Sequence, residues 1–134
     1  MGNRDRPLNG LRLLLVEDDP VIAMELDELI QSLGAEVVGP FSRLAPALAA
    51  VSREVIAGAV LDFRLDGETT IPIIDVLLDC SKPILLVTGG GPGALPERYL
   101  GTARLDKPFE PAEFEYMAIS ISSAPRTFRS NETD

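Results

Sequence analysis

Residues 13–20 read Leu-Leu-Leu-Val-Glu-Asp-Asp-Pro, an apolar run that ends in three acidic residues and a proline. A short apolar run bounded by charged residues is typical of a buried strand, which we predict over residues 11–16. Asp19 and Pro20 suit the start of a helix, because a carboxylate can cap free backbone N–H groups and the first turn does not need the N–H that proline lacks. The stretch therefore predicts a strand that leads into a helix, with Glu17 and Asp18 at the junction.

The alternation of strand and helix continues along the chain. The first helix runs to residue 33, where Gly34 supplies a stop. Further strands are predicted over residues 35–38, 57–61, 84–87 and 103–106. Further helices are predicted after a capping Ser42, over residues 70–79 and over residues 110–121. Glycines and prolines between Thr88 and residue 100 leave room for only a short or irregular fourth helix.

Alternating strands and helices favour a parallel sheet with helices on both faces. We therefore predict an α/β fold, a doubly wound parallel sheet of five strands. The carboxyl ends of all the strands then lie at one edge, which is where such sheets bind ligands.

Composition excludes several classes of function. The 134 residues carry 21 acidic and 12 basic side chains, a net charge of −9, which argues against general binding of nucleic acid. There is no histidine, so catalysis by a histidine base and histidine-ligated metal sites are excluded. The single cysteine, Cys80, allows no intrachain disulfide and is expected to be a small apolar filler. The apolar runs are too short for a membrane span and no signal peptide is recognised, so we expect a cytoplasmic protein with no membrane partner.

Polar residues stand at the predicted strand ends. Glu17 and Asp18 follow the first strand, Asp62 the third, Thr88 ends the fourth, and Lys107 follows the fifth. Any one of them could be an ordinary surface or turn residue, but five suitable groups at one edge favour a functional site.

The residue types at this edge point to phosphoryl chemistry. Clustered carboxylates repel one another unless a cation lies among them, and an all-oxygen cluster suits Mg²⁺. A magnesium ion and the Lys107 ammonium would neutralise a phosphoryl group, to which Thr88 could donate a hydrogen bond. Asp62 would then be the nucleophile that forms an acyl phosphate.

Four motifs together resemble the receiver domain of two-component response regulators, over residues 8–123. They are Leu-Leu-Leu-Val-Glu-Asp-Asp-Pro at 13–20, Val-Leu-Asp at 60–62, Val-Thr-Gly at 87–89 and Asp-Lys-Pro-Phe at 106–109. The resemblance implies a (βα)5 flavodoxin-like fold, with flexible tails expected at residues 1–7 and 124–134.

The resemblance also implies a role for each residue of the site. Asp62 would accept phosphate from a sensor histidine kinase or a histidine phosphotransfer protein, and Thr88 and Lys107 would bind the phosphoryl oxygens. The peptide bond between Lys107 and Pro108 is expected to be cis. The implied Mg²⁺ ligands are Glu17, Asp18, Asp62 and the backbone carbonyl of Arg64.

Three shorter pieces, at 36–40, 61–68 and 83–89, are similar to stand-alone receivers of alphaproteobacteria, several of which work with HWE-type kinases. We expect a single-domain response regulator without a DNA-binding output domain. It would act as a switch for a regulatory protein partner or as a phosphate sink.

Two departures from the family pattern concern the output. Arg104 stands where many receivers have an aromatic switch residue, and glycines fill residues 89–93 around Pro92. We therefore expect phosphorylation to reorganise residues 89–101 instead of rotating a ring.

Other functions fit the sequence less well. An aspartyl phosphatase would need an acid at the position of Arg64, and neither a P-loop nor a cofactor-binding loop is present. We expect a phosphoacceptor and not an enzyme. The alternative left open is a pseudo-receiver that binds partners without phosphorylation.

Overall fold

The computed structural model describes residues 6–89 and 95–132, with side chains through Ser122. Its centre is a parallel sheet with the strand order β2-β1-β3-β6-β7, which confirms the predicted α/β fold. The strands are β1 (Arg12–Val16), β2 (Glu36–Phe41), β3 (Gly58–Leu61), β6 (Ile84–Thr88) and β7 (Ala103–Asp106).

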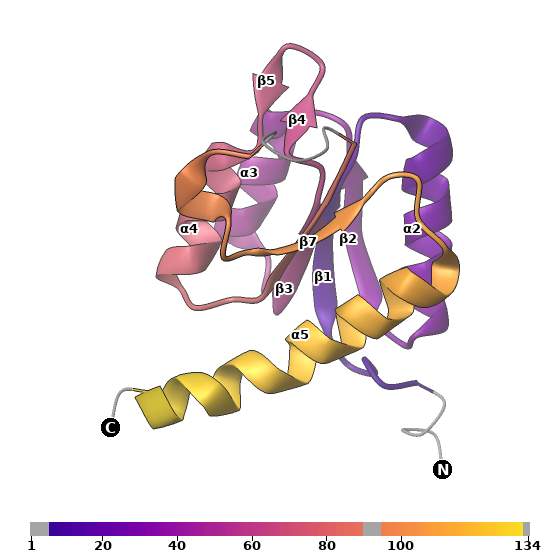
Figure 1. Cartoon of the computed structure of the whole chain (residues 1–134). Helices are drawn as coiled ribbons and strands as arrows, with labels where there is room; N and C mark the ends of the chain where they lie inside the picture. The colour runs from indigo at the N-terminus through magenta and orange to yellow at the C-terminus, as the bar shows by residue number, and fades with distance from the viewer. Residues whose placement is uncertain (1–5, 90–94, 133–134) are drawn as a thin grey trace.

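Helices cover both faces of the sheet. Figure 1 shows α2 (Pro20–Ser32) and α5 (Pro111–Glu132) on one face and α3 (Leu44–Arg53) and α4 (Ile71–Asp79) on the other. Apolar side chains of alternate strand positions pack under each layer, in two separate clusters. The sheet is therefore buried on both faces, and its strand ends are the places where polar groups can gather.

The helix after β1 begins as predicted. Asp19 is the N-cap of α2, and its Oδ1 accepts from the N–H groups of Val21 at 2.9 Å and Ile22 at 3.3 Å. This cap fixes the turn in which Glu17 and Asp18 lie. Leu8, which precedes β1, is buried, and its N–H donates to the Leu33 carbonyl at the end of α2.

The second strand and the third helix differ from the prediction. β2 continues through Gly39 and Pro40 to Phe41, because the Phe41 carbonyl still accepts from the Glu17 N–H at 2.9 Å. Ser42 does not cap α3. The N-cap is Arg43, and the first N–H of the helix, that of Leu44, donates to the side chain of Glu68 at 2.9 Å.

The loop after β3 is a small hairpin, which the sequence did not indicate. β4 (Arg64–Leu65) pairs antiparallel with β5 (Glu68–Thr69) around a turn at Asp66 and Gly67. Gly67 has a φ of +78°, which glycine adopts without strain. The hairpin projects beyond the sheet on the side of the strand ends (Figure 1), and Leu65 anchors it in the core.

In the last part of the chain, the short fourth helix is confirmed, whereas the predicted end of the last helix and the predicted burial of Cys80 are wrong. The predicted fourth helix is a single 3-10 turn, η1 (Glu97–Tyr99), and residues 90–94 of the glycine-rich stretch lie outside the described residues. α5 runs to Glu132 and so extends beyond the helix end predicted at residue 121, while the flexibility expected of residues 124–134 stays a prediction. Cys80 is exposed at the end of α4 and is not a core filler. Within the described ranges, no helix is long and apolar enough to span a membrane.

Candidate functional site

The predicted site residues do come together at one edge of the sheet. Glu17 follows β1, Asp62 follows β3, Thr88 ends β6 and Lys107 follows β7. All of these strands are parallel, so their carboxyl ends face the same way. Glu17, Asp62 and Thr88 are each less than a tenth exposed.

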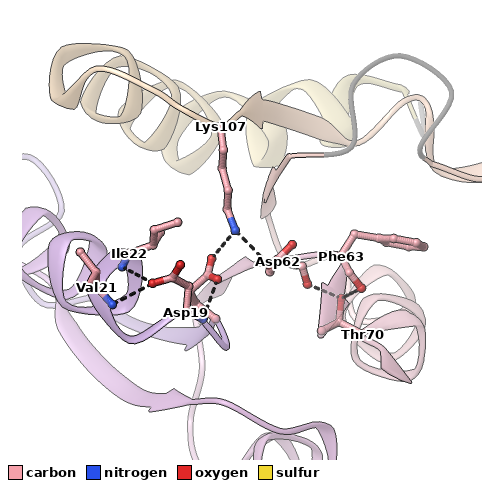
Figure 2. A network of polar contacts seen from close by, with 8 residues as sticks. Asp19, Val21, Ile22, Asp62, Phe63, Thr70 and Lys107 are labelled. Carbon is pink, nitrogen blue, oxygen red and sulfur yellow. Dashed lines mark hydrogen bonds and ion pairs between the residues drawn. The ribbon is translucent and has the colours of Figure 1, made fainter. Parts of the chain in front are cut away.

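Lys107 bridges two carboxylates across the site. Its Nζ lies 2.8 Å from Glu17 Oε1 and 2.9 Å from Asp62 Oδ2, and Figure 2 shows the side chain pointing between the strands toward Asp62. The backbone supports this position, because the Lys107 N–H donates to the Thr88 carbonyl at 2.9 Å. The peptide bond to Pro108 is cis, as the resemblance implies.

Three carboxylates of the site can reach one cation. Glu17, Asp18 and Asp62 each offer an oxygen, and these oxygens lie within 4.8 Å of one another. Oxygen-only donors suit a hard ion such as Mg²⁺. Glu17 Oε1 is buried and, apart from the ion pair with Lys107, accepts no hydrogen bond from any described residue. The donor set fits a magnesium site.

Burial governs the ionisation of Glu17. Desolvation, helped by the negative charge of Asp62, raises the pKa of Glu17 to about 7, while Lys107 and the Asp19 N–H oppose the rise. Burial of the Lys107 ammonium works to lower its pKa, but the contacts with Glu17 and Asp62 outweigh it, and the pKa of Lys107 is raised. Lys107 therefore stays charged at neutral pH.

The backbone of Asp62 is held on both sides. Its N–H donates to the Val16 carbonyl at 2.9 Å, and its carbonyl accepts from Thr70 Oγ1 at 2.8 Å (Figure 2). Sequence reasoning missed Thr70 because it expected only a helix start there. The only available signal was a threonine directly before an apolar run, and the structure shows that this threonine is fully buried.

Two arginines lie beside the site. Arg64 is exposed on β4, with its guanidinium 5.4 Å from the centre of the Phe63 ring. Arg104, at the position of the aromatic switch, donates from Nε to Asp106 at 2.7 Å. The role of the Arg64 carbonyl as a metal ligand stays a prediction.

Two surface hollows open next to Asp18. One, of about 500 Å³, lies between the hairpin and the start of α3 and includes Arg43 and Arg64. The other, of about 570 Å³, lies between α2 and the end of β2 and includes Met24 and Phe41. Asp18 therefore lines both hollows, and Glu17 lines the second one.

Comparison with protein-family models gives no match. The curated phyllosphere-induced regulator PhyR of Methylorubrum extorquens is 33% identical over 109 residues, which are 75% of this chain and 39% of that protein. The chain thus spans about two fifths of the length of this relative.

Two solved structures extend the comparison. SdrG from Sphingomonas melonis Fr1 is 31% identical with a TM-score of 0.74, over 83% of this chain and 95% of SdrG. A CheY-like response regulator receiver domain from Methylobacillus flagellatus shares the fold at 23% identity and a TM-score of 0.69, over 83% of this chain and 98% of that domain. With its five-stranded fold and its relatives, the chain belongs to the CheY-like response regulator receiver domains.

Proposed function

We propose that this receiver domain accepts a phosphoryl group on Asp62 from a sensor histidine kinase or a histidine phosphotransfer protein, with the help of Mg²⁺. The observation that carries the proposal is the contact between Lys107 Nζ and Asp62 Oδ2, 2.9 Å, beside two further carboxylates. A lone acidic cluster could be ordinary surface charge. A partly buried lysine that contacts two of three carboxylates able to share one cation suits the transfer of a dianionic group.

The proposed reaction moves a phosphoryl group from a histidine nitrogen of the donor protein to a carboxylate oxygen of Asp62. A carboxylate oxygen of Asp62 attacks the phosphorus of a phosphohistidine, and the phosphorus–nitrogen bond breaks as the new oxygen–phosphorus bond forms. The electron pair of the broken bond stays on the ring nitrogen, so a phosphohistidine that is protonated on its other ring nitrogen leaves as neutral imidazole, and an unprotonated one takes a proton from water. Because this chain contains no histidine, the phosphohistidine must belong to the partner.

The other site residues receive roles that follow from their charges. Glu17, Asp18, Asp62 and the backbone carbonyl of Arg64 would hold Mg²⁺, which when bound neutralises the oxygens of the phosphoryl group. Lys107 would pair with one phosphoryl oxygen, which requires it to release a carboxylate that it contacts in this structure. Thr88, buried at the end of β6, would donate a hydrogen bond from its hydroxyl to another phosphoryl oxygen.

This function is that of a signalling domain, acting within residues 8–123, and not of an enzyme with a separate substrate. Arg64 occupies the position where an aspartyl phosphatase needs an acid. The phosphorylated form would act in the cytoplasm as a switch for a regulatory protein, or the domain would drain phosphate from a kinase. The resemblance to stand-alone alphaproteobacterial receivers favours a kinase of the HWE type.

Intact-mass measurement tests the proposal. Incubation with acetyl phosphate and Mg²⁺ should add one phosphoryl group to the wild type and none to Asp62→Asn, and EDTA should abolish the addition. Asp66→Asn is the matched control, because Asp66 is an exposed aspartate of the same loop and should not be needed. A wild type that takes up no phosphate would instead favour a pseudo-receiver that binds partners without phosphorylation.

A further inference from the structure

We infer that Thr70 is a positioning residue for the phosphoacceptor: its buried hydroxyl fixes the backbone of Asp62 and thereby aims the Asp62 carboxylate. The inference rests on the proposed role of Asp62 as the phosphoacceptor. Thr70 lies eight residues after Asp62, at the far end of the hairpin, and nothing in the receiver motifs quoted above includes it.

The contacts of Thr70 point back to the end of β3. Its side chain is 0% exposed, and its Oγ1 lies 2.8 Å from the Asp62 carbonyl oxygen and 3.3 Å from that of Phe63. The Thr70 N–H donates to the Phe63 carbonyl at 2.9 Å. Thr70 therefore holds two consecutive carbonyls of the segment that carries the phosphoacceptor, as Figure 2 shows.

The hydroxyl does not serve the helix that Thr70 begins. A threonine at an N-cap ordinarily accepts a hydrogen bond from a backbone N–H of the first turn. Within the described chain, the Thr70 side chain makes no such bond, and the Thr70 carbonyl instead accepts from the N–H groups of Ile73 and Ile74. A buried hydroxyl is costly unless it is hydrogen-bonded, so its bond to Asp62 explains why this position is polar.

Asp62 needs this support because the sheet ends before it. The last pairing of β3 with β6 is that of Leu61 with Leu86, so the Asp62 carbonyl lies beyond the sheet. Its N–H is held by the Val16 carbonyl on one side, and Thr70 holds its carbonyl on the other. The two bonds fix the peptide groups on both sides of the Asp62 Cα, and the direction of the side chain follows from them.

The test separates the hydroxyl from the bulk of the side chain. Thr70→Val keeps the shape and removes the hydroxyl, and Thr70→Ser keeps the hydroxyl and removes a methyl group. We expect Thr70→Val to lower the rate of Asp62 phosphorylation by acetyl phosphate, at saturating donor and Mg²⁺, by about tenfold, as loss of supporting contacts does in other sites. Thr70→Ser should stay within about twofold of the wild type.

Two control variants exclude general effects. Thr69→Val removes the neighbouring hydroxyl, which contacts the Ile71 N–H and not Asp62. Ile74→Val shortens a fully buried side chain of α4, the helix that Thr70 precedes. It serves as a control for a loss of stability like that of Thr70→Val, because it does not alter the contacts of Asp62. Both should phosphorylate at the wild-type rate when assayed well below their melting temperatures. If Thr70→Val does not fold, Thr70→Ala lacks the same hydroxyl and takes its place.

The outcomes separate the two proposals. A slow Thr70→Val, a normal Thr70→Ser and normal controls support the positioning role. If Asp62 of the wild type is phosphorylated and Thr70→Val reacts equally fast, or if Ile74→Val is slowed as much, the inference about Thr70 fails alone. If the wild type takes up no phosphate, the proposed function fails and the inference fails with it.

Discussion

Lys107 Nζ lies 2.9 Å from Asp62 Oδ2, although the two residues are 45 positions apart in the chain. The contact exists because β3 and β7 are parallel strands on either side of β6, so the residues that follow them arrive at one edge of the sheet. The ammonium neutralises a pocket that would otherwise hold only negative charge.

Removing the ammonium should destabilise the protein more at high pH than at low pH. Lys107→Met leaves buried Glu17 without its ion partner, and we expect a loss of about 1–3 kcal/mol in the free energy of unfolding at pH 8. The pKa of Glu17 is raised to about 7, so Glu17 is protonated at pH 5.5 and the loss should be smaller there. Urea unfolding at both pH values checks this, with Lys82→Met as the control for charge removal. An equal loss at both pH values would contradict it.

Magnesium binding should weaken as the pH falls below 7. In the metal-free protein, burial raises the pKa of Glu17 to about 7, and a cation must displace that proton to use the carboxylate. The affinity should therefore fall by about tenfold for each pH unit below 7 and level off above it. Isothermal titration at pH 6, 7 and 8 measures this dependence. A constant affinity over that range would contradict the combination of a raised pKa and a metal-ligand role for Glu17.

Asp18→Asn should bind Mg²⁺ at least about tenfold more weakly than the wild type, because it removes one of three converging carboxylates. The metal-free variant should melt about 2–4 °C higher, since repulsion within the acidic cluster is reduced. Asp19→Asn is the matched control, because it removes one negative charge at the adjacent position. Asparagine is also a favoured N-cap, so the cap of α2 is preserved. If both variants bind Mg²⁺ alike, the role of Asp18 is wrong.

Glu68→Ala should lower the free energy of unfolding by about 1 kcal/mol. The Glu68 carboxylate accepts from the first N–H of α3, and the variant leaves this donor without its acceptor. The ion pair of Glu68 with exposed Arg43 should add little. Denaturant unfolding of Glu68→Ala and Asp66→Ala, an exposed acid of the same hairpin, measures the difference. Equal stabilities would mean that the cap contributes nothing.

The sequence predicted the site well for a physical reason. In a parallel sheet the topology alone brings strand ends together, so locating the strands was enough to group Glu17, Asp62, Thr88 and Lys107. The N-cap at Asp19 was predictable as well, because capping is local to one turn.

The features that were missed depend on contacts between separate segments. The cap of α3 comes from Glu68, 24 residues beyond Leu44, while local pattern favoured Ser42. The hydrogen bond from the Thr70 hydroxyl to the Asp62 carbonyl likewise depends on how the β4–β5 hairpin returns the chain to the end of β3. The last helix runs past its predicted end because the apolar spacing in the sequence stops near Ile121, while the helix continues to Glu132.

The central claim is that Asp62, and no other carboxylate of the cluster, receives the phosphoryl group. Borohydride reduces an acyl phosphate to an alcohol, which converts a phosphorylated aspartate into homoserine. After reaction with acetyl phosphate and Mg²⁺, reduction and peptide mass spectrometry should therefore find homoserine at position 62. Homoserine at position 18 would contradict the assignment of Asp62. So would the absence of homoserine from every position in a protein that binds Mg²⁺ normally.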